Sequence, residues 1–214
     1  MRILNLNLLV FSFLCMTFFH QNIEAYDNEI AHRHINENAI SGDSFVRTFL
    51  RTTLRFNKDI NQKIGEKRIW EIISDGGYEE DEPGYRPLRH FHDPLKPWDE
   101  AGFLSQFTSM IFWAQTPEPD NDYELYNEYS WWGARNAYRN ALLSGSEEEY
   151  ALTFRSLGQL MHIVSDAAVP EHVRNDAHPF SRPYEEWVQN NIETLEYDLS
   201  LIHISEPTRP RLIS

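Results

Sequence analysis

Histidine and aspartate interrupt an otherwise apolar segment, "MHIVSDAAVPEH", which runs from residue 161 to residue 172. His162 and Asp166 are four residues apart, so on a helix their side chains project from one face, one turn apart. An imidazole and a carboxylate at this spacing can bind one metal ion. The alternatives are that the two side chains pair only with each other, or that His162 is a core histidine with a hydrogen-bond partner. For an isolated pair these alternatives are the more common outcome.

The pair is not isolated, because other histidines also lie near acidic residues such as Asp93, Glu185 and Glu186. Between residues 26 and 198 all seven histidines fall into such clusters: His32, His34, His90, His92, His162, His172 and His178. This clustering favours several zinc ions over scattered structural histidines. The formal net charge of −14 argues against a general nucleic-acid binder, which usually has a basic face. It does not exclude a metal site, since carboxylates that bind metal count as negative.

The elements that must position these residues are predicted to be helices. Residues 26 to 198 show a helical pattern without convincing strand alternation, which predicts an all-α fold formed by a bundle of several helices around a multi-zinc cleft. The expected helices cover residues 43–56, 66–77, 102–115, 127–145, 146–170 and 184–198. Between the second and third helices, residues 78–98 form a long loop rich in proline and glycine, and loops of this length are often functional.

Helix boundaries follow from capping residues. Asp43 is a good N-cap for the first helix, and Gly76 and Gly77 are expected to end the second. The helix over 146–170 should begin at a capping box, Ser146 to Glu149, and stop at proline. Its buried surface is expected to come from four apolar side chains: Leu157, Leu160, Met161 and Val164.

The motif around His162 resembles the central element of the zinc-dependent phospholipase C and single-strand-specific nuclease superfamily. Members of that superfamily have an all-helical fold with a three-zinc site. "LMHIVSDAAVPEH" is similar to the family element in which a histidine, an aspartate four residues later and a histidine ten residues later bind metal. The resemblance implies that His162, Asp166 and His172 are ligands, and it extends from about His32 to Val188.

Four shorter motifs add to the resemblance. "HFHDP" looks like the family's "HFYDP", which implies that His90 is a ligand and His92 is not. "GGYEED" resembles a segment in which a metal-binding aspartate follows a glycine by five residues, which implies Asp81. "HRHINENAI" resembles the N-terminal segment with a histidine eight residues before isoleucine, and it implies His32. "YEEWV" resembles "YENFV" and implies Glu185 as the last ligand.

Two departures from the family pattern affect the ligand set. In the phospholipases a ligand histidine lies four residues before the last glutamate, where this chain has Ser181. His178 lies seven residues before that glutamate, and an insertion around Pro179 would bring it to the metal. The family's mature N-terminus, usually tryptophan, binds zinc through its amine and carbonyl. Here the corresponding residue is Tyr26, whose backbone atoms would bind in the same way.

The resemblance also implies roles in the reaction. Zinc ions bridged by Asp166 would polarise a phosphoryl oxygen and activate water for in-line attack on a phosphodiester. Asp81 is implied to be the catalytic residue as well as a ligand, orienting or deprotonating the attacking water. Residues that would orient the ligands or the substrate, unless they are ordinary polar loop residues, are Arg89, Asp93 and Asn175.

The substrate is a separate question. Lipid-cleaving members hold a choline-like head group with aromatic residues, but here Glu82 follows the metal aspartate and Pro87 stands three residues before His90. We expect a phospholipase C acting on a phospholipid or other phosphodiester, with transient contact with a membrane surface, as a monomer without a stable nucleic-acid partner. The alternatives are a single-strand nuclease, whose tryptophans would stack on bases, and a catalytically inactive helical module stabilised by metal.

Both ends of the chain have expected roles outside the domain. Residues 1–25 resemble an export signal with an apolar run from Ile3 to Phe19, which predicts a secreted or periplasmic protein beginning at Tyr26. The only cysteine, Cys15, would leave with the signal. Residues 26–198 would form the phospholipase C-like domain, incomplete at its C-terminus. The tail over 199–214, "LSLIHISEPTRPRLIS", reads as the translation of a transposon-based sequencing adapter with its index.

Overall fold

The chain folds into helices joined by irregular segments, and the computed structural model describes residues 28–117, 126–176 and 183–191. The expected signal, Tyr26, His178 and the tail over 199–214 lie outside these residues. The α-helices are α2 (Arg33–Gly42), α3 (Ser44–Thr52), α4 (Ile69–Glu79), α5 (Met110–Gln115), α6 (Trp131–Ser144), α7 (Glu147–Asp166), α8 (Pro170–Val173) and α9 (Pro183–Asn191). Shorter elements are the π-helical turn η1 (Asn28–His32), the 3-10 turns η2 (Asp59–Asn61), η3 (Arg86–Arg89) and η4 (Phe103–Ser105), and the strands β1 (Lys63–Ile64) and β2 (Lys67–Arg68).

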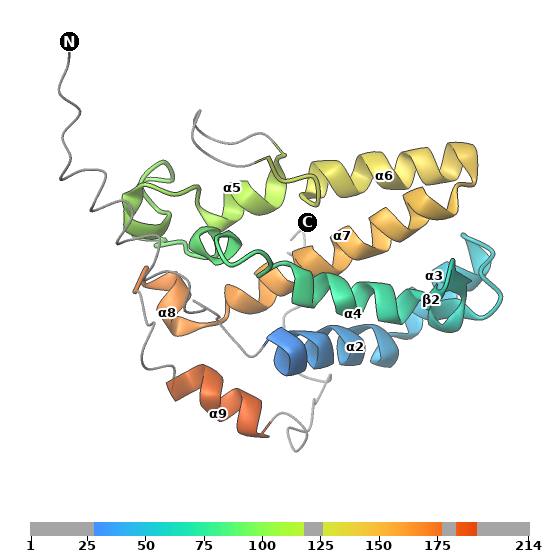
Figure 1. Ribbon diagram of the computed structural model, residues 1–214, viewed down its shortest axis with the longest axis horizontal. Coiled ribbons are helices and arrows are strands. Elements are labelled where there is room, and N and C mark those ends of the chain that lie inside the picture. Colours follow the sequence, from blue (N-terminus) through green and yellow to red (C-terminus); the bar gives the residue numbers. More distant parts are fainter. Residues whose placement is uncertain (1–27, 118–125, 177–182, 192–214) are drawn as a thin grey trace, which may run out of the picture.

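Helices α6, α7, α4 and α2 lie side by side in that order, with α7 and α4 in the middle (Figure 1). Apolar side chains fill the space between α2, α3, α4 and α7, and they form the largest buried cluster: Ile40, Leu50, Ile60, Ile64, Ile69, Ile72, Ile73 and Phe154. A smaller cluster of Ala31, Val169 and Val188 joins η1, the start of α8 and α9. The predicted all-α fold is confirmed.

Two predicted helix starts are confirmed by their capping contacts. The Asp43 carboxylate accepts hydrogen bonds from the backbone N–H of Phe45 at 2.6 Å and of Val46 at 3.2 Å. The Ser146 hydroxyl accepts one from the backbone N–H of Glu149 at 3.4 Å. These contacts satisfy amide groups that have no partner within the first turn of a helix.

Helix α4 differs from its prediction, because it continues through Gly76 and Gly77 to Glu79 instead of ending at them. A Cβ atom on Gly76 would overlap the carbonyl of Arg155, and one on Gly158 would overlap the carbonyl of Ile73. The glycines of α4 and α7 therefore allow the two backbones to approach closely. This packing requirement explains glycine within α4 better than a helix stop does.

Replacing Gly158 with alanine should destabilise the protein by about 1–3 kcal/mol, the usual cost of overpacking a core. The added methyl group would meet backbone atoms of Ile73 and Gly76, which cannot rotate away. Denaturant unfolding would measure the loss. Gly84→Ala is the matched control, because no atom lies within 4 Å of the added Cβ there. Equal free energies of unfolding for the two variants would contradict the close packing of α4 against α7.

Helix α7 presents a different face to the core from the one predicted. Leu157 and Val164 are exposed, with 37% and 72% of their surface accessible, and Leu160 and Met161 are partly buried. The buried positions of α7 instead carry Phe154, Ser156, Gly158, Gln159, His162, Ile163 and Asp166. The prediction was wrong because it assigned the inner face by hydrophobicity, whereas polar side chains occupy much of that face.

The remaining predictions hold in part. The segment over 102–115 forms two short elements, η4 and α5, instead of one helix, and residues 78–98 contain the end of α4 and η3. The two-residue strands β1 and β2 pair as a hairpin that the helical pattern did not predict. Among the described residues, no helix combines the length and the apolar character needed to cross a membrane.

Candidate metal centre

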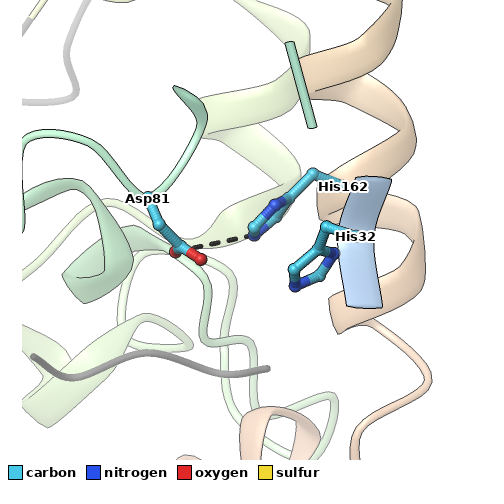
Figure 2. Close-up of side chains that lie close together, drawn as sticks. All are labelled: His32, Asp81 and His162. Atoms are coloured by element: carbon cyan, nitrogen blue, oxygen red, sulfur yellow. Dashed lines mark ion pairs between the residues drawn. The ribbon is translucent and has the colours of Figure 1, made fainter. Parts of the chain in front are cut away.

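Seven buried residues from six parts of the chain lie at one end of the α4–α7 pair. They are His32 at the end of η1, Asp81 after α4, His90 after η3, His162 and Asp166 on α7, His172 on α8 and Glu185 on α9. Each has at most 3% of its surface accessible. Figure 2 shows three of them, His32, Asp81 and His162, with the aspartate facing the neighbouring imidazole. We call these seven residues the His/Asp cluster.

Four members of the cluster surround one point. Nδ1 of His90 lies 2.8 Å from Oδ2 of Asp166 and 3.3 Å from Oδ1 of Asp81. Nε2 of His162 lies 3.2 Å from Oδ2 of Asp166 and 3.6 Å from Oδ1 of Asp81. The rings of His90 and His162 are edge to face with centroids 4.9 Å apart, so the two histidines share one side of the bundle. Two imidazoles and two carboxylates therefore present their ligand atoms to the same place.

Asp166 also contacts His32 and His172, the two outer histidines of the cluster. Its Oδ1 lies 3.5 Å from Nε2 of His32, and its Oδ2 lies 3.6 Å from Nδ1 of His172. Nε2 of His172 in turn lies 3.7 Å from Oε1 of Glu185. Asp166 thus faces the imidazoles of both outer histidines as well as those of His90 and His162.

Contacts outside the cluster fix the orientation of three rings. Nδ1 of His162 lies 2.7 Å from the carbonyl oxygen of Gly77, and Nδ1 of His172 lies 2.7 Å from that of His90. A carbonyl oxygen can only accept, so each Nδ1 carries the proton. The Ser165 hydroxyl donates to the His162 carbonyl at 2.7 Å and can accept from Nδ1 of His32 at 3.1 Å. These contacts leave Nε2 of His32 and of His162 facing Asp166, and Nε2 of His172 facing Glu185.

The polar atoms at the centre of the cluster lack normal hydrogen bonds. Among the described residues, both carboxylate oxygens of Asp81 and of Asp166, both ring nitrogens of His90 and Nε2 of His162 have no hydrogen-bond partner. Buried polar and charged groups are costly unless they are paired or coordinate a metal. Two triads have ligand atoms within 4.8 Å of one another, namely His32 with Asp81 and His162, and His90 with His162 and Asp166. These buried groups can hold a metal ion.

The proximity of the charges shifts the pKa values within the cluster. Burial disfavours the imidazolium of His90, but contacts with Asp166 and Glu80 outweigh burial and raise its pKa to about 10. Burial raises the pKa of the Asp81 carboxyl to about 6. Burial acts in the same direction on Asp166, but the neighbouring His162 and His172 outweigh it and hold its pKa well below the usual range. Without metal, the central carboxylates therefore favour the protonated forms of His90 and His162, whose pKa values are both raised, whereas burial lowers the pKa of His32.

Metal binding at pH 7 should release protons. The pKa of His90 is raised to about 10 without metal, so the ring is protonated at pH 7 and must lose that proton to become a ligand. Metal affinity should accordingly increase as the pH rises from 7 toward 10. Calorimetric zinc titrations in two buffers with different ionisation enthalpies would measure the release. Binding heats that do not depend on the buffer would contradict this protonation state.

Other polar residues singled out from the sequence lie outside the cluster. His92 is buried, but its Nδ1 contacts the Ser109 hydroxyl at 2.9 Å. His34 is partly buried and Glu186 is exposed. The Asp93 carboxylate accepts from the backbone N–H of Leu95 at 3.0 Å, so its observed contact is within its own loop.

Two further residues suggested as orienting groups contact nearby backbone. The guanidinium of Arg89 donates to the carbonyl of Tyr85 at 2.8 Å. The side-chain amide of Asn175 donates to the carbonyl of Gly102 at 2.7 Å. The groups that do orient cluster histidines, Ser165 and the Gly77 carbonyl, were not predicted from the sequence. Ser165 stands three residues after His162, a helical spacing that would have suggested proximity to it.

Comparisons with known proteins add no constraint: no family model, no curated protein and no solved structure matches the chain.

Proposed function

We propose that this chain is a zinc-dependent phosphodiesterase that hydrolyses phospholipids in the manner of a phospholipase C. The observation that carries the proposal is the buried cluster of four imidazoles and three carboxylates with Asp166 at its centre. Imidazole and carboxylate ligands suit zinc, and a cluster of this size can supply more than one site. The resemblance of the sequence motifs to the phospholipase C and nuclease superfamily supports three ions.

The ligand atoms suggest how the residues would divide among the ions. One ion would be held by Asp81, His90, His162 and Asp166, whose ligand atoms surround one point. A second would be held by Asp166 and His32. The third would be held by His172 and Glu185. The family resemblance adds the backbone atoms of Tyr26 to the second ion and His178 to the third. Zinc bound in this way polarises a phosphoryl oxygen and lowers the pKa of water.

In the proposed reaction Asp81 would act as the general base. Its carboxylate would orient the attacking water and accept its proton as the water oxygen bonds to phosphorus. The bond between phosphorus and the leaving oxygen then breaks, and the leaving alcohol takes up a proton. The products are a phosphomonoester and, from a phospholipid, a diacylglycerol. No side chain needs to form a covalent intermediate.

A single-strand nuclease is the second candidate. Trp98 favours it, because 53% of its surface is accessible and its ring lies edge to face against His92, with centroids 6.0 Å apart. An exposed aromatic ring of this kind could stack on a base. The net charge of −14 weighs against a polyanionic substrate and places the phospholipase first.

Hydrolysis assays separate the candidates. The protein would be given a chromogenic phosphocholine ester, phosphatidylcholine vesicles and single-stranded DNA, each with and without a chelator, and zinc would be restored afterwards. The proposal predicts chelator-sensitive release of the phosphorylated head group and no cleavage of DNA. DNA cleavage alone would favour the nuclease. Zinc uptake without hydrolysis of any substrate would indicate the inactive, metal-stabilised module and overturn the proposed activity.

A further inference from the structure

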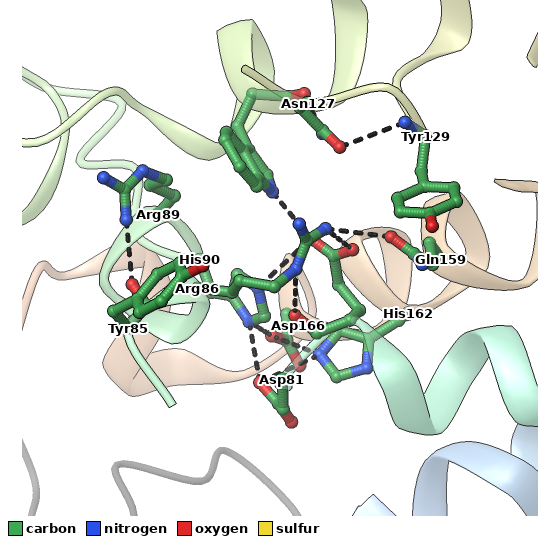
Figure 3. A network of polar contacts seen from close by, with 12 residues as sticks. Asp81, Tyr85, Arg86, Arg89, His90, Asn127, Tyr129, Gln159, His162 and Asp166 are labelled. Carbon is green, nitrogen blue, oxygen red and sulfur yellow. Dashed lines mark hydrogen bonds and ion pairs between the residues drawn. The ribbon is translucent and has the colours of Figure 1, made fainter. Parts of the chain in front are cut away.

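A second buried polar network adjoins the His/Asp cluster on the side of His90. Its centre is Glu80, which precedes the ligand Asp81 and has 1% of its surface accessible. The Trp113 indole N–H donates to Oε1 of Glu80 at 2.6 Å. The Arg86 guanidinium pairs with Oε2 of Glu80 and also donates to the Glu80 carbonyl at 2.8 Å. The carboxylate is therefore held on both oxygens. Figure 3 labels Arg86, His90 and Gln159 of this network.

Further contacts hold the partners of Glu80 in place. Arg86 donates to the side-chain oxygen of Gln159 on α7 at 2.8 Å, and its guanidinium lies 4.9 Å from the centroid of the Trp113 ring. The side-chain amide of Asn127 donates to the Trp113 carbonyl at 2.8 Å. Arg86, Trp113, Gln159 and Asn127 are all buried. A carboxylate fixed by buried groups from several elements has little freedom to move.

A further neighbour of this carboxylate is His90. Oε1 of Glu80 lies 3.5 Å from Nε2 of His90, on the side of the ring opposite the nitrogen that faces Asp81 and Asp166. His90 is thereby distinguished from the other cluster histidines, whose Nδ1 atoms contact Ser165, the Gly77 carbonyl and the His90 carbonyl. Nε2 of His32 and of His162 faces Asp166, and Nε2 of His172 faces Glu185. His90 instead faces Asp81 and Asp166 with Nδ1.

We propose that Glu80 is a positioning residue that keeps the proton of His90 on Nε2 and so presents Nδ1 to the metal. The inference rests on the proposed metal-dependent function. Carboxylates commonly accept the second N–H of a metal-binding histidine, which fixes the tautomer and raises the basicity of the ligand nitrogen. Oε1 has a second lone-pair direction available for this contact beside the one that Trp113 uses.

The first test needs no substitution. In zinc-loaded protein, nitrogen-15 NMR of the histidine rings should show Nδ1 of His90 bound to zinc and Nε2 protonated. His32, His162 and His172 should show the reverse. Coordination of His90 through Nε2 would overturn the proposal, whatever the hydrolytic activity of the protein.

The second test compares Glu80→Gln with Glu82→Gln, a nearby exposed position that loses the same charge. Zinc affinity measured by competition with a chelating dye should fall by about 10- to 100-fold in the first variant, the usual effect of losing such a partner, and should not change in the second. Glu80→Asp keeps the charge but withdraws the carboxylate, so its affinity should also fall. If Glu80→Gln does not fold, the zinc affinity of Glu80→Asp tests the role of Glu80 instead.

The outcomes separate this proposal from the proposed function. Zinc binding by the natural protein together with unchanged affinity in Glu80→Gln would overturn the role of Glu80 and leave the phosphodiesterase proposal standing. A purely structural Glu80 would lower the melting temperature of the variants without changing the His90 tautomer or the zinc affinity. A natural protein that binds no zinc would overturn both proposals.

Discussion

Replacing Asp166 with alanine should remove zinc from the protein and lower the rate of phosphodiester hydrolysis by more than about 100-fold. Losing a residue that only orients a ligand costs about 10- to 100-fold, and Asp166 is placed to act as a ligand itself. Its carboxylate faces four imidazoles, those of His32, His90, His162 and His172, so its loss would affect every group of the cluster. Elemental analysis and the hydrolysis assay would measure the two effects.

Two neighbouring glutamates provide the control. Glu185 is buried and lies 3.7 Å from Nε2 of His172, whereas Glu186 is exposed. Glu185→Ala should reduce the zinc content, and Glu186→Ala should change neither the zinc content nor the rate. Equal zinc loss in the two glutamate variants would show that Glu185 was wrongly chosen. Full zinc content in Asp166→Ala would contradict the bridging role.

Removing zinc should lower the melting temperature by roughly 8–16 °C. Free zinc at about 1,000 times its dissociation constant stabilises a folded protein by about 4 kcal/mol, and each kcal/mol corresponds to about 2–4 °C for a chain of this size. The physical reason is that the carboxylate oxygens of Asp81 and Asp166, both ring nitrogens of His90 and Nε2 of His162 are buried without hydrogen-bond partners among the described residues. A chelator that removes zinc would therefore leave these buried groups without the ions that offset the unfavourable free energy of burying them.

Thermal unfolding monitored by circular dichroism, with chelator and then with zinc restored, would measure this shift. The Asp166→Ala variant is the control, because its melting temperature should respond little to either treatment. A shift of similar size in the natural protein and in this variant would mean that zinc acts elsewhere on the chain. An unchanged melting temperature of the natural protein would contradict a metal centre within the fold.

Much of the cluster could be predicted from the sequence because its members carry recognisable spacing. His162 and Asp166 are one helical turn apart, and His172 follows the proline that ends their segment. The grouping of the remaining histidines beside acidic residues indicated the segments that contain His32 and His90, and the family resemblance implied these two histidines as ligands. Residues far apart along the chain can be assigned to one site in this way when their side chains are chemically rare and their number is small.

Glu80 and the inner face of α7 could not be predicted in the same way. The segment Glu79 to Glu82 contains four consecutive acidic residues, and nothing in their order separates the buried Glu80 from the more accessible Glu79 and Glu82. Their difference arises from contacts with Arg86 and Trp113, which depend on the tertiary structure. On α7, Leu157 and Val164 suggested the wrong inner face because glycine and polar residues occupy it.

Anomalous diffraction at the zinc absorption edge tests the central claim most directly, because it locates zinc independently of activity. Crystals of the protein grown with zinc should show a strong anomalous peak between Asp81, His90, His162 and Asp166. Further peaks are predicted beside His32 and between His172 and Glu185. Zinc peaks only at surface sites, or none within the His/Asp cluster, would contradict a metal-dependent phosphodiesterase built on these residues.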